Sequence, residues 1–266
     1  MDTVQTQISE NNRIAVKPCS IKLLPSELWI RAANTAIQIN PNNAPAFHQL
    51  KQAGIKLPVE HLALLTAKKW WQGKVNLTVG FLDNPAADLR ARILTHMNAW
   101  SAFCNVSFVQ TDTDPQVRIS RNSGDGYWSY LGTDILHIDA DKETMNLDGF
   151  TMNTPDSEFY RVVRHETGHT LGFPHEHMRS EIVNKIDKEK AIAYFGATQG
   201  WNKQEVVDQV LTPIPTSALI ATEQADPNSI MCYWLPGRIM KDGIDVPGGT
   251  DIDAQDAKFA TIVYPK

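Results

Sequence analysis

The stretch His165-Glu166-Thr167-Gly168-His169-Thr170-Leu171-Gly172-Phe173-Pro174-His175 brings three histidines and a glutamate close together in the chain. Residues four apart lie on one face of a helix, so His165 and His169 can bind one metal ion from the same side. Gly172 can adopt the left-handed conformation that ends a helix, and His175 can then return as a third nitrogen ligand. Three protein ligands and one open position are typical of a catalytic zinc site, whereas a structural site uses four protein ligands. We therefore predict one catalytic Zn²⁺ per chain.

Glu166 directly follows the first histidine and points about 100° away from it around the helix. Its carboxylate can reach a water molecule at the metal without binding the metal, which is the position of a general base. The pattern therefore predicts metal-assisted hydrolysis.

The sequence around this stretch predicts an α+β (α/β) domain. Alternating apolar residues predict strands at 75–79, 106–110, 116–120 and 133–139. A helical period predicts helices at 87–103, 187–210 and 253–263, and one that begins at Thr154-Pro155-Asp156 and ends at Gly172. Residues 211–250 show neither period and are expected to form loops.

Residues 1–65 differ from the rest, because they are rich in Asn, Pro and short polar runs. We interpret them as an N-terminal extension or pro-like segment, with short helices at 26–38 and 44–53, before a catalytic domain at 66–266. Cys19 is a candidate thiolate ligand that could occupy the open metal position. The sequence favours an extension without this role.

Composition excludes several classes of partner. The net charge is −5 and the pI is about 5.9, without a run of like charges, so neither nucleic acid nor an anionic membrane is expected as a partner. No apolar run approaches the ~18–20 residues of a membrane span, and the N-terminus lacks the apolar stretch of a signal peptide. The three cysteines are far apart and odd in number, so no disulfide framework is implied. The oligomeric state is left open.

Three segments together resemble the astacin family of metzincin zinc peptidases. The histidine motif continues into Glu176-His177-Met178-Arg179, as in astacins. Ser229-Ile230-Met231-Cys232-Tyr233 is similar to the family's methionine turn, and the segment 126–132 is similar to its Gly-Cys-Trp-Ser segment. The resemblance extends from about Trp70 to Tyr264. It implies a zinc-dependent endopeptidase, which hydrolyses internal peptide bonds.

The resemblance also implies the metzincin (zincin-like) fold. This fold has a twisted, mainly parallel sheet with an antiparallel edge strand, and two long helices above the cleft. An upper subdomain at about 66–172 would be followed by an irregular lower subdomain at about 173–266, which the C-terminal helix closes. The strand near 133–139 would be the sheet edge to which an extended peptide substrate adds antiparallel.

Individual roles follow from the same resemblance. Met231 would form the hydrophobic floor beneath the histidine ligands. Tyr233 would be a fifth zinc ligand that moves away when substrate binds and then donates to the oxyanion. Glu176 would contact the new N-terminus after removal of a pro-segment. No match to the aspartate-bearing inhibitory motif of astacin propeptides is found in residues 1–60.

The chain departs from the family pattern at its cysteines. Tyr127 replaces a cysteine that forms a disulfide in these proteases, and Cys104 lacks a partner near the C-terminus. This indicates a disulfide-lacking, bacterial-type member. Localisation stays open, because the resemblance favours secretion while the cysteine usage permits the cytoplasm.

Two other functions share part of this sequence pattern. A catalytically silent zinc-binding module would lack Glu166 or a ligand, and a zinc hydrolase of a non-peptide amide would share the motif.

The acidic cluster of Asp251, Asp253 and Asp256 could bind calcium, but Asp253 is better explained as a helix N-cap. Arg238 is a candidate for selecting an acidic substrate residue, although a solvated surface arginine is commoner.

Overall fold

The computed structural model describes residues 19–44, 66–71, 73–214 and 224–266. Within them, a six-stranded sheet has the order β1-β5-β6-β4-β2-β3. The strands are β1 (Cys19–Lys22), β2 (Val75–Phe81), β3 (Val106–Gln110), β4 (Val117–Ser120), β5 (Tyr127–Tyr130) and β6 (Met145–Leu147). All neighbours pair in parallel except β5 and β6, which are antiparallel. The prediction of a mainly parallel sheet with an antiparallel edge strand, β5, is confirmed, and β1 adds to the outside of that edge.

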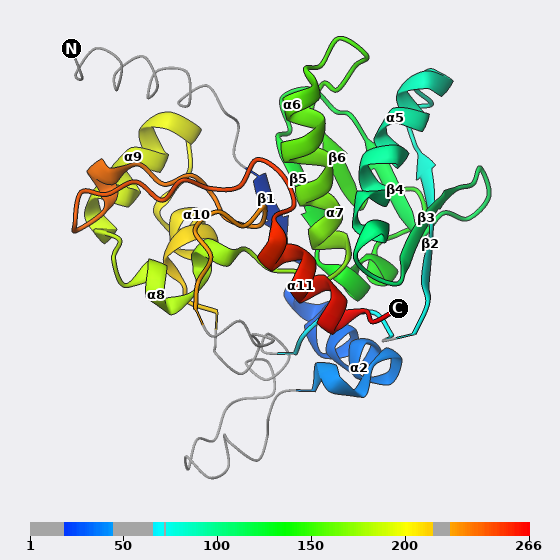
Figure 1. The fold of residues 1–266 in the computed structure, drawn as a ribbon, viewed down its shortest axis with the longest axis horizontal. Helices are drawn as coiled ribbons and strands as arrows, with labels where there is room; N and C mark the ends of the chain where they lie inside the picture. Colours follow the sequence, from blue (N-terminus) through cyan, green and yellow to red (C-terminus); the bar gives the residue numbers. More distant parts are fainter. Residues whose placement is uncertain (1–18, 45–65, 72, 215–223) are drawn as a thin grey trace.

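Two long helical segments cover one face of the sheet and lie side by side (Figure 1). The first is α5 (Ala87–Met97), which continues as the 3-10 helix η3 (Asn98–Ala102). Leu89, Ile93 and Met97 of α5 recur at every fourth position and are buried in the core, as an amphipathic helix requires. The second segment consists of α6 (Asp156–Glu158), a π-helical turn η5 (Phe159–Val163) and α7 (Arg164–Thr170).

After α7 the chain enters a second half, whose described residues form several helices before the C-terminal one. They are η6 (Glu176–Met178), α8 (Ser180–Val183), α9 (Lys188–Gln199), α10 (Lys203–Val206), the π-helical η7 (Val207–Leu211) and η9 (Gly237–Ile239). Gly200, at φ +71°, ends α9 and divides the helix predicted at 187–210. These elements enclose a separate apolar cluster, which includes Phe195, Val210 and Leu235.

The last helix, α11 (Ala254–Val263), lies between the two halves (Figure 1). Its N-cap is Asp253, whose side chain accepts from the backbone N–H groups of Gln255 and Asp256, while the Asp256 side chain accepts from the N–H of Asp253. The capping role predicted for Asp253 is therefore confirmed.

The prediction of a strand at 133–139 is wrong. Residues Gly132–His137 form a 3-10 helix, η4, in which the Thr133 N–H donates to the carbonyl of Lys68 instead of to a strand. The buried Asp134 pairs with the Lys68 ammonium group at 3.3 Å, which holds this segment against residues 66–71. The strand β5, directly before η4, takes the place expected for this segment, and β1 lies outside it as the edge of the sheet.

The N-terminal residues 19–44 are more regular than the sequence suggests. After β1, they form η1 (Ser26–Leu28), α2 (Trp29–Ile39) and η2 (Pro41–Asn43), which confirms the helix predicted at 26–38. The amide of Asn43 donates to the carbonyls of Ala36 and Lys69. The helix predicted at 44–53 lies almost wholly outside the described residues. Among the helices that are described, none is long and apolar enough to cross a bilayer.

Candidate metal centre and active site

The three histidines of the motif converge at the junction of the two halves. His165 and His169 lie one turn apart on α7, and the chain turns at Gly172, which has φ +87° as predicted. His175 then returns, so that its Nε2 atom lies 3.3 Å from Nε2 of His165 and 3.0 Å from Nε2 of His169. A tetrahedral zinc ion with Zn–N distances of about 2.1 Å would place its ligand atoms about 3.4 Å apart. The spacing therefore fits one zinc ion.

Hydrogen bonds at the far side of two rings orient these ligands. Nδ1 of His165 lies 2.5 Å from the carbonyl oxygen of Ile230, and Nδ1 of His169 lies 2.8 Å from that of Phe173. A carbonyl can only accept, so each Nδ1 carries the proton and each Nε2 presents a lone pair to the centre. Burial lowers the pKa of His165 to about 4, so its ring is neutral, as a metal ligand must be.

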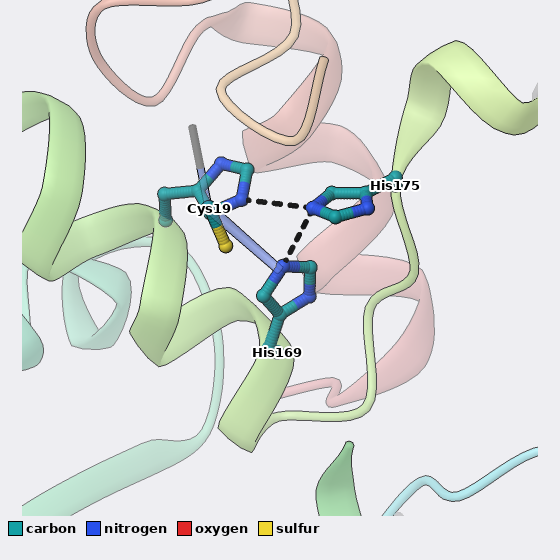
Figure 2. A group of neighbouring side chains, drawn as sticks. Cys19, His169 and His175 are labelled. Carbon is teal, nitrogen blue, oxygen red and sulfur yellow. Dashed lines mark hydrogen bonds between the residues drawn. The ribbon is translucent and has the colours of Figure 1, made fainter. Parts of the chain in front are cut away.

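Cys19 completes this group from the N-terminal strand. Its sulfur and one ring nitrogen of each of the three histidines all lie within 4.8 Å of one another, and all four side chains are buried. Figure 2 shows the sulfur directed toward the nitrogens of His169 and His175. A thiolate is a strong zinc ligand, and four protein ligands make a closed site. This placement favours a role for Cys19 at the metal over the interpretation of residues 1–65 as an extension without one.

Glu166 lies beside this group without belonging to it. It is completely buried, and neither carboxylate oxygen has a hydrogen-bond partner in the described part of the chain. Burial raises the pKa of Glu166 to about 8, although the neighbouring Cys19 and the charge of Arg161 act in the opposite direction. A buried carboxyl group next to three metal ligands is suited to accept and return a proton near neutral pH.

Met231 lies directly against the helix that carries the first two ligands. A Cβ atom added to Gly168 would collide with the Met231 sulfur, so a larger residue there would displace the methionine. The turn is held by Asp256 of α11, which accepts from the Ser229 hydroxyl at 2.6 Å and from the Ile230 N–H at 2.8 Å. Met231 thus lies against the turn of α7 that separates His165 from His169, and its role as the floor of the site stays a prediction.

Tyr233 lies next to the third ligand, His175. Its ring centroid is 4.4 Å from that of His175, and its hydroxyl is buried without a hydrogen-bond partner among the described residues. The ring of His177 stacks on Tyr233, a contact that sequence reasoning did not identify. The sequence feature that could have indicated this contact is the position of His177, two residues after the last ligand.

Glu176 faces Asp226 rather than the metal ligands. It accepts a hydrogen bond of 3.0 Å from the Asp226 N–H and forms an ion pair with Arg179 at 3.5 Å. Burial raises the pKa of Glu176 to about 7. Its proposed contact with a new N-terminus stays a prediction.

A cavity of about 380 Å³ opens next to the metal centre and is lined by residues of both halves, among them Cys19, Glu166 and Tyr233. Arg161 also lines it, whereas Arg238 is exposed, with its guanidinium over the Tyr194 ring at 4.5 Å. Arg161 was not identified from the sequence, although its position four residues before His165 places it on the ligand face of the helix.

The three cysteines are all free and buried. Cys104 and Cys232 lie in the apolar clusters of the two halves, and burial raises the pKa of the Cys104 thiol to about 12. Cys19 also belongs to the cluster of the second half, and burial also raises the pKa of its thiol, but its sulfur faces the histidine nitrogens.

Comparison with known proteins agrees with this geometry. Residues 64–209 match the family model of the Astacin peptidases. A solved structure of myroilysin is 32% identical, covers 75% of this chain and 96% of its own, and has a TM-score of 0.70. Zinc metalloproteinase nas-27 of Caenorhabditis elegans is 30% identical over 115 residues, which are 43% of this chain but only 24% of the nematode protein. The hatching enzyme high choriolytic enzyme 1 of the medaka Oryzias latipes shares the fold, with a TM-score of 0.50 at 22% identity over 74% of this chain and 93% of its own.

The predictions of a metzincin fold, of a catalytic zinc ion and of a zinc-dependent endopeptidase are confirmed by these comparisons. The extent of the family match and the likeness to myroilysin over nearly its whole length leave one assignment: the chain belongs to the astacin family of peptidases.

Proposed function

We propose that the protein is a latent zinc endopeptidase, in which the thiolate of Cys19 occupies the metal position that catalysis requires. The supporting observation is the convergence of the Cys19 sulfur with the ligand nitrogens of His165, His169 and His175. Four protein ligands leave no place for a water molecule, so hydrolysis requires Cys19 to leave. On this proposal residues 1–65 are a pro-segment and residues 66–266 are the catalytic domain.

The direction of β1 supports latency. β1 pairs in parallel with β5, with Cys19 opposite Tyr127 and Lys22 opposite Tyr130. A substrate is expected to bind the same edge antiparallel, so β1 occupies the edge with its backbone reversed. The strand therefore fills the cleft without presenting a peptide bond in the orientation of a substrate.

Once Cys19 has left, the remaining residues have separate roles. The bound zinc supplies Lewis-acid polarisation of water and of the substrate carbonyl. Glu166 accepts the proton of the attacking water and returns it to the leaving amine. The Tyr233 hydroxyl, which lacks a partner among the described residues of the latent form, donates to the oxyanion that develops on the carbonyl.

The two alternatives are less well supported. A catalytically silent module would have lost a ligand or Glu166, and all four residues are present. A hydrolase of a non-peptide amide would not need an edge that binds extended polypeptide, whereas β5 binds β1 in this way. Peptide or protein substrates are therefore proposed. Secretion, which family membership favours, stays a prediction.

The proposal is tested on the zinc-loaded full chain with Cys19→Ser, and with Cys104→Ser as a matched buried control. Casein hydrolysis should rise at least about tenfold in the Cys19 variant, because a neutral hydroxyl is a far weaker zinc ligand than a thiolate. After replacement of zinc by cobalt(II), the wild type and the control should show thiolate-to-metal charge-transfer absorption that the Cys19 variant lacks. Equal activity and equal spectra in all three proteins would exclude latency through Cys19.

A further inference from the structure

The side chain of Gln209 binds the outer side of β1. The backbone N–H of Ile21 donates to Oε1 of Gln209 at 3.3 Å, and Nε2 of Gln209 donates to the Ile21 carbonyl at 3.2 Å. A glutamine amide carries one acceptor and a donor group side by side, so it matches the N–H and C=O of one extended residue. Gln209 therefore takes the place of a neighbouring strand, opposite β5.

Gln209 is held in this position by its place in a buried turn and by His177, which also contacts Tyr233. It lies in the π-helical turn η7, where the adjacent Val210 is buried in the apolar cluster of the lower half. The Gln209 carbonyl accepts a hydrogen bond of 2.9 Å from Nε2 of His177, whose ring stacks on Tyr233. The position of Gln209 is thus coupled to the metal centre and does not rest on β1 alone.

We propose that Gln209 is a positioning residue for substrate, and that it binds the backbone of one substrate residue as it binds Ile21. This inference rests on the proposed function. The N–H and C=O of one residue in a strand point to the same side, whichever way the strand runs. Because an amide can rotate to exchange its donor and acceptor, it can serve a strand of either direction.

The register identifies the substrate residue. Cys19, at the metal, lies opposite Tyr127, and Ile21 lies opposite Ser129. In a substrate that runs antiparallel to β5, with its scissile carbonyl in the place of Cys19, the residue opposite Ser129 lies about two positions before the one that carries this carbonyl. Gln209 should therefore recognise the third residue on the N-terminal side of the cleaved bond, through its backbone and independently of its side chain. The ligand class is an extended peptide with at least three residues before the cleaved bond.

The test uses peptide hydroxamates, because the hydroxamate group binds zinc and fixes the register without any need for cleavage. The probes are acetyl-(Ala)₃-hydroxamate, which reaches Gln209, and acetyl-Ala-hydroxamate, which does not. Their dissociation constants are measured by calorimetry on the zinc-loaded full chain with Cys19→Ser, so that the ligand position is free. Both hydroxamates take the place of Cys19, so both must displace β1, and its competition largely cancels in the ratio of the two constants.

Gln209→Met keeps the length of the side chain but removes both hydrogen bonds. The preference for the longer probe should fall about tenfold, as expected for two neutral hydrogen bonds. The control Gln204→Met lies in the same region, where the Gln204 amide bonds only to Asp208 among the described residues, and it should keep the full preference. An unchanged preference in Gln209→Met would overturn the proposal.

A second measurement separates this inference from the proposed function. In the full chain with Cys19 present, amide hydrogen exchange of residues 19–22 should be faster in Gln209→Met than in Gln204→Met. Failure of both probes to bind the protein with an intact Gln209 would contradict the zinc site itself. Even then the exchange measurement remains decisive for Gln209. Equal exchange rates of residues 19–22 in the two glutamine variants would overturn its role.

Discussion

The rings of Tyr233 and His177 are stacked, with centroids 4.1 Å apart and planes inclined by 17°. The Tyr233 N–H donates to Nδ1 of His177 at 3.4 Å, and Nε2 of His177 donates to the Gln209 carbonyl. Burial lowers the pKa of His177 to about 3, so the ring is neutral and can both accept and donate. The histidine therefore fixes the tyrosine ring, while the tyrosine hydroxyl can find its partner on the substrate.

Tyr233→Phe tests the role of that hydroxyl. The substitution keeps the ring and its stacking on His177 and removes only the donor. A donor that acts on the developing oxyanion stabilises the transition state more than the bound substrate, so kcat should fall by about 10²–10³ with little change in KM. Steady-state kinetics on the activated enzyme measure this. A kcat equal to that of the wild type would make Tyr233 an ordinary packing residue.

Glu166→Ala tests the separation of base from ligand. The carboxylate lies outside the group of four converging ligand atoms, so the variant should keep its zinc while losing peptide hydrolysis. Zinc content by elemental analysis and cleavage of casein are measured on the same sample, in the Cys19→Ser background. Loss of zinc in proportion to activity would contradict the assignment of Glu166 as a base.

His175→Ala tests the metal stoichiometry. The wild type should contain one zinc ion per chain when purified without added metal. The variant loses the ligand whose Nε2 lies close to both other histidine nitrogens, so its zinc affinity should fall strongly. His137→Ala is the control, because that histidine lies in η4, outside the group of ligands. Wild-type protein that stays zinc-free after incubation with added zinc would refute the site.

Asp256→Asn tests the support of the methionine turn through its pH dependence. Burial raises the pKa of Asp256 from 3.8 to about 6 in the folded protein. The folded state therefore binds more protons than the unfolded state between about pH 4 and 6, so the contribution of Asp256 to stability decreases as the pH rises through this range. Between pH 4 and 7 the wild type should therefore lose up to ~3 kcal/mol of unfolding free energy relative to the variant. Denaturant titrations at several pH values measure it, and a constant difference would show an unshifted pKa.

Local sequence patterns were sufficient for most of the catalytic domain. The four-residue spacing of His165 and His169 and the left-handed glycine at Gly172 are local features, and both appear as predicted. The helix that begins after Asp253 was likewise visible from its cap. In each case the physical cause lies within one or two turns of the chain.

The errors concern contacts between distant segments. The segment 133–139 alternates like a strand, but Lys68 binds both the Thr133 N–H and the Asp134 carboxylate, and this tertiary contact selects a 3-10 helix. The position of Cys19 depends on the pairing of β1 with β5, more than 100 residues later in the chain. A four-residue strand carries too little periodicity to reveal its partner.

The pairing of β1 with β5 also affects the solution behaviour of the enzyme. While β1 is in place, the backbone groups of β5 that face β1 are paired with that strand. Gln209 covers part of the opposite side of β1. Departure of β1 leaves β5 as an open sheet edge, a structure that pairs readily with strands from other molecules. On the proposed function, the surface that binds a peptide substrate is therefore also the one most exposed to self-association. The N-terminal strand would protect this sheet edge until activation, and the freshly activated enzyme should be most prone to aggregate when no substrate is present.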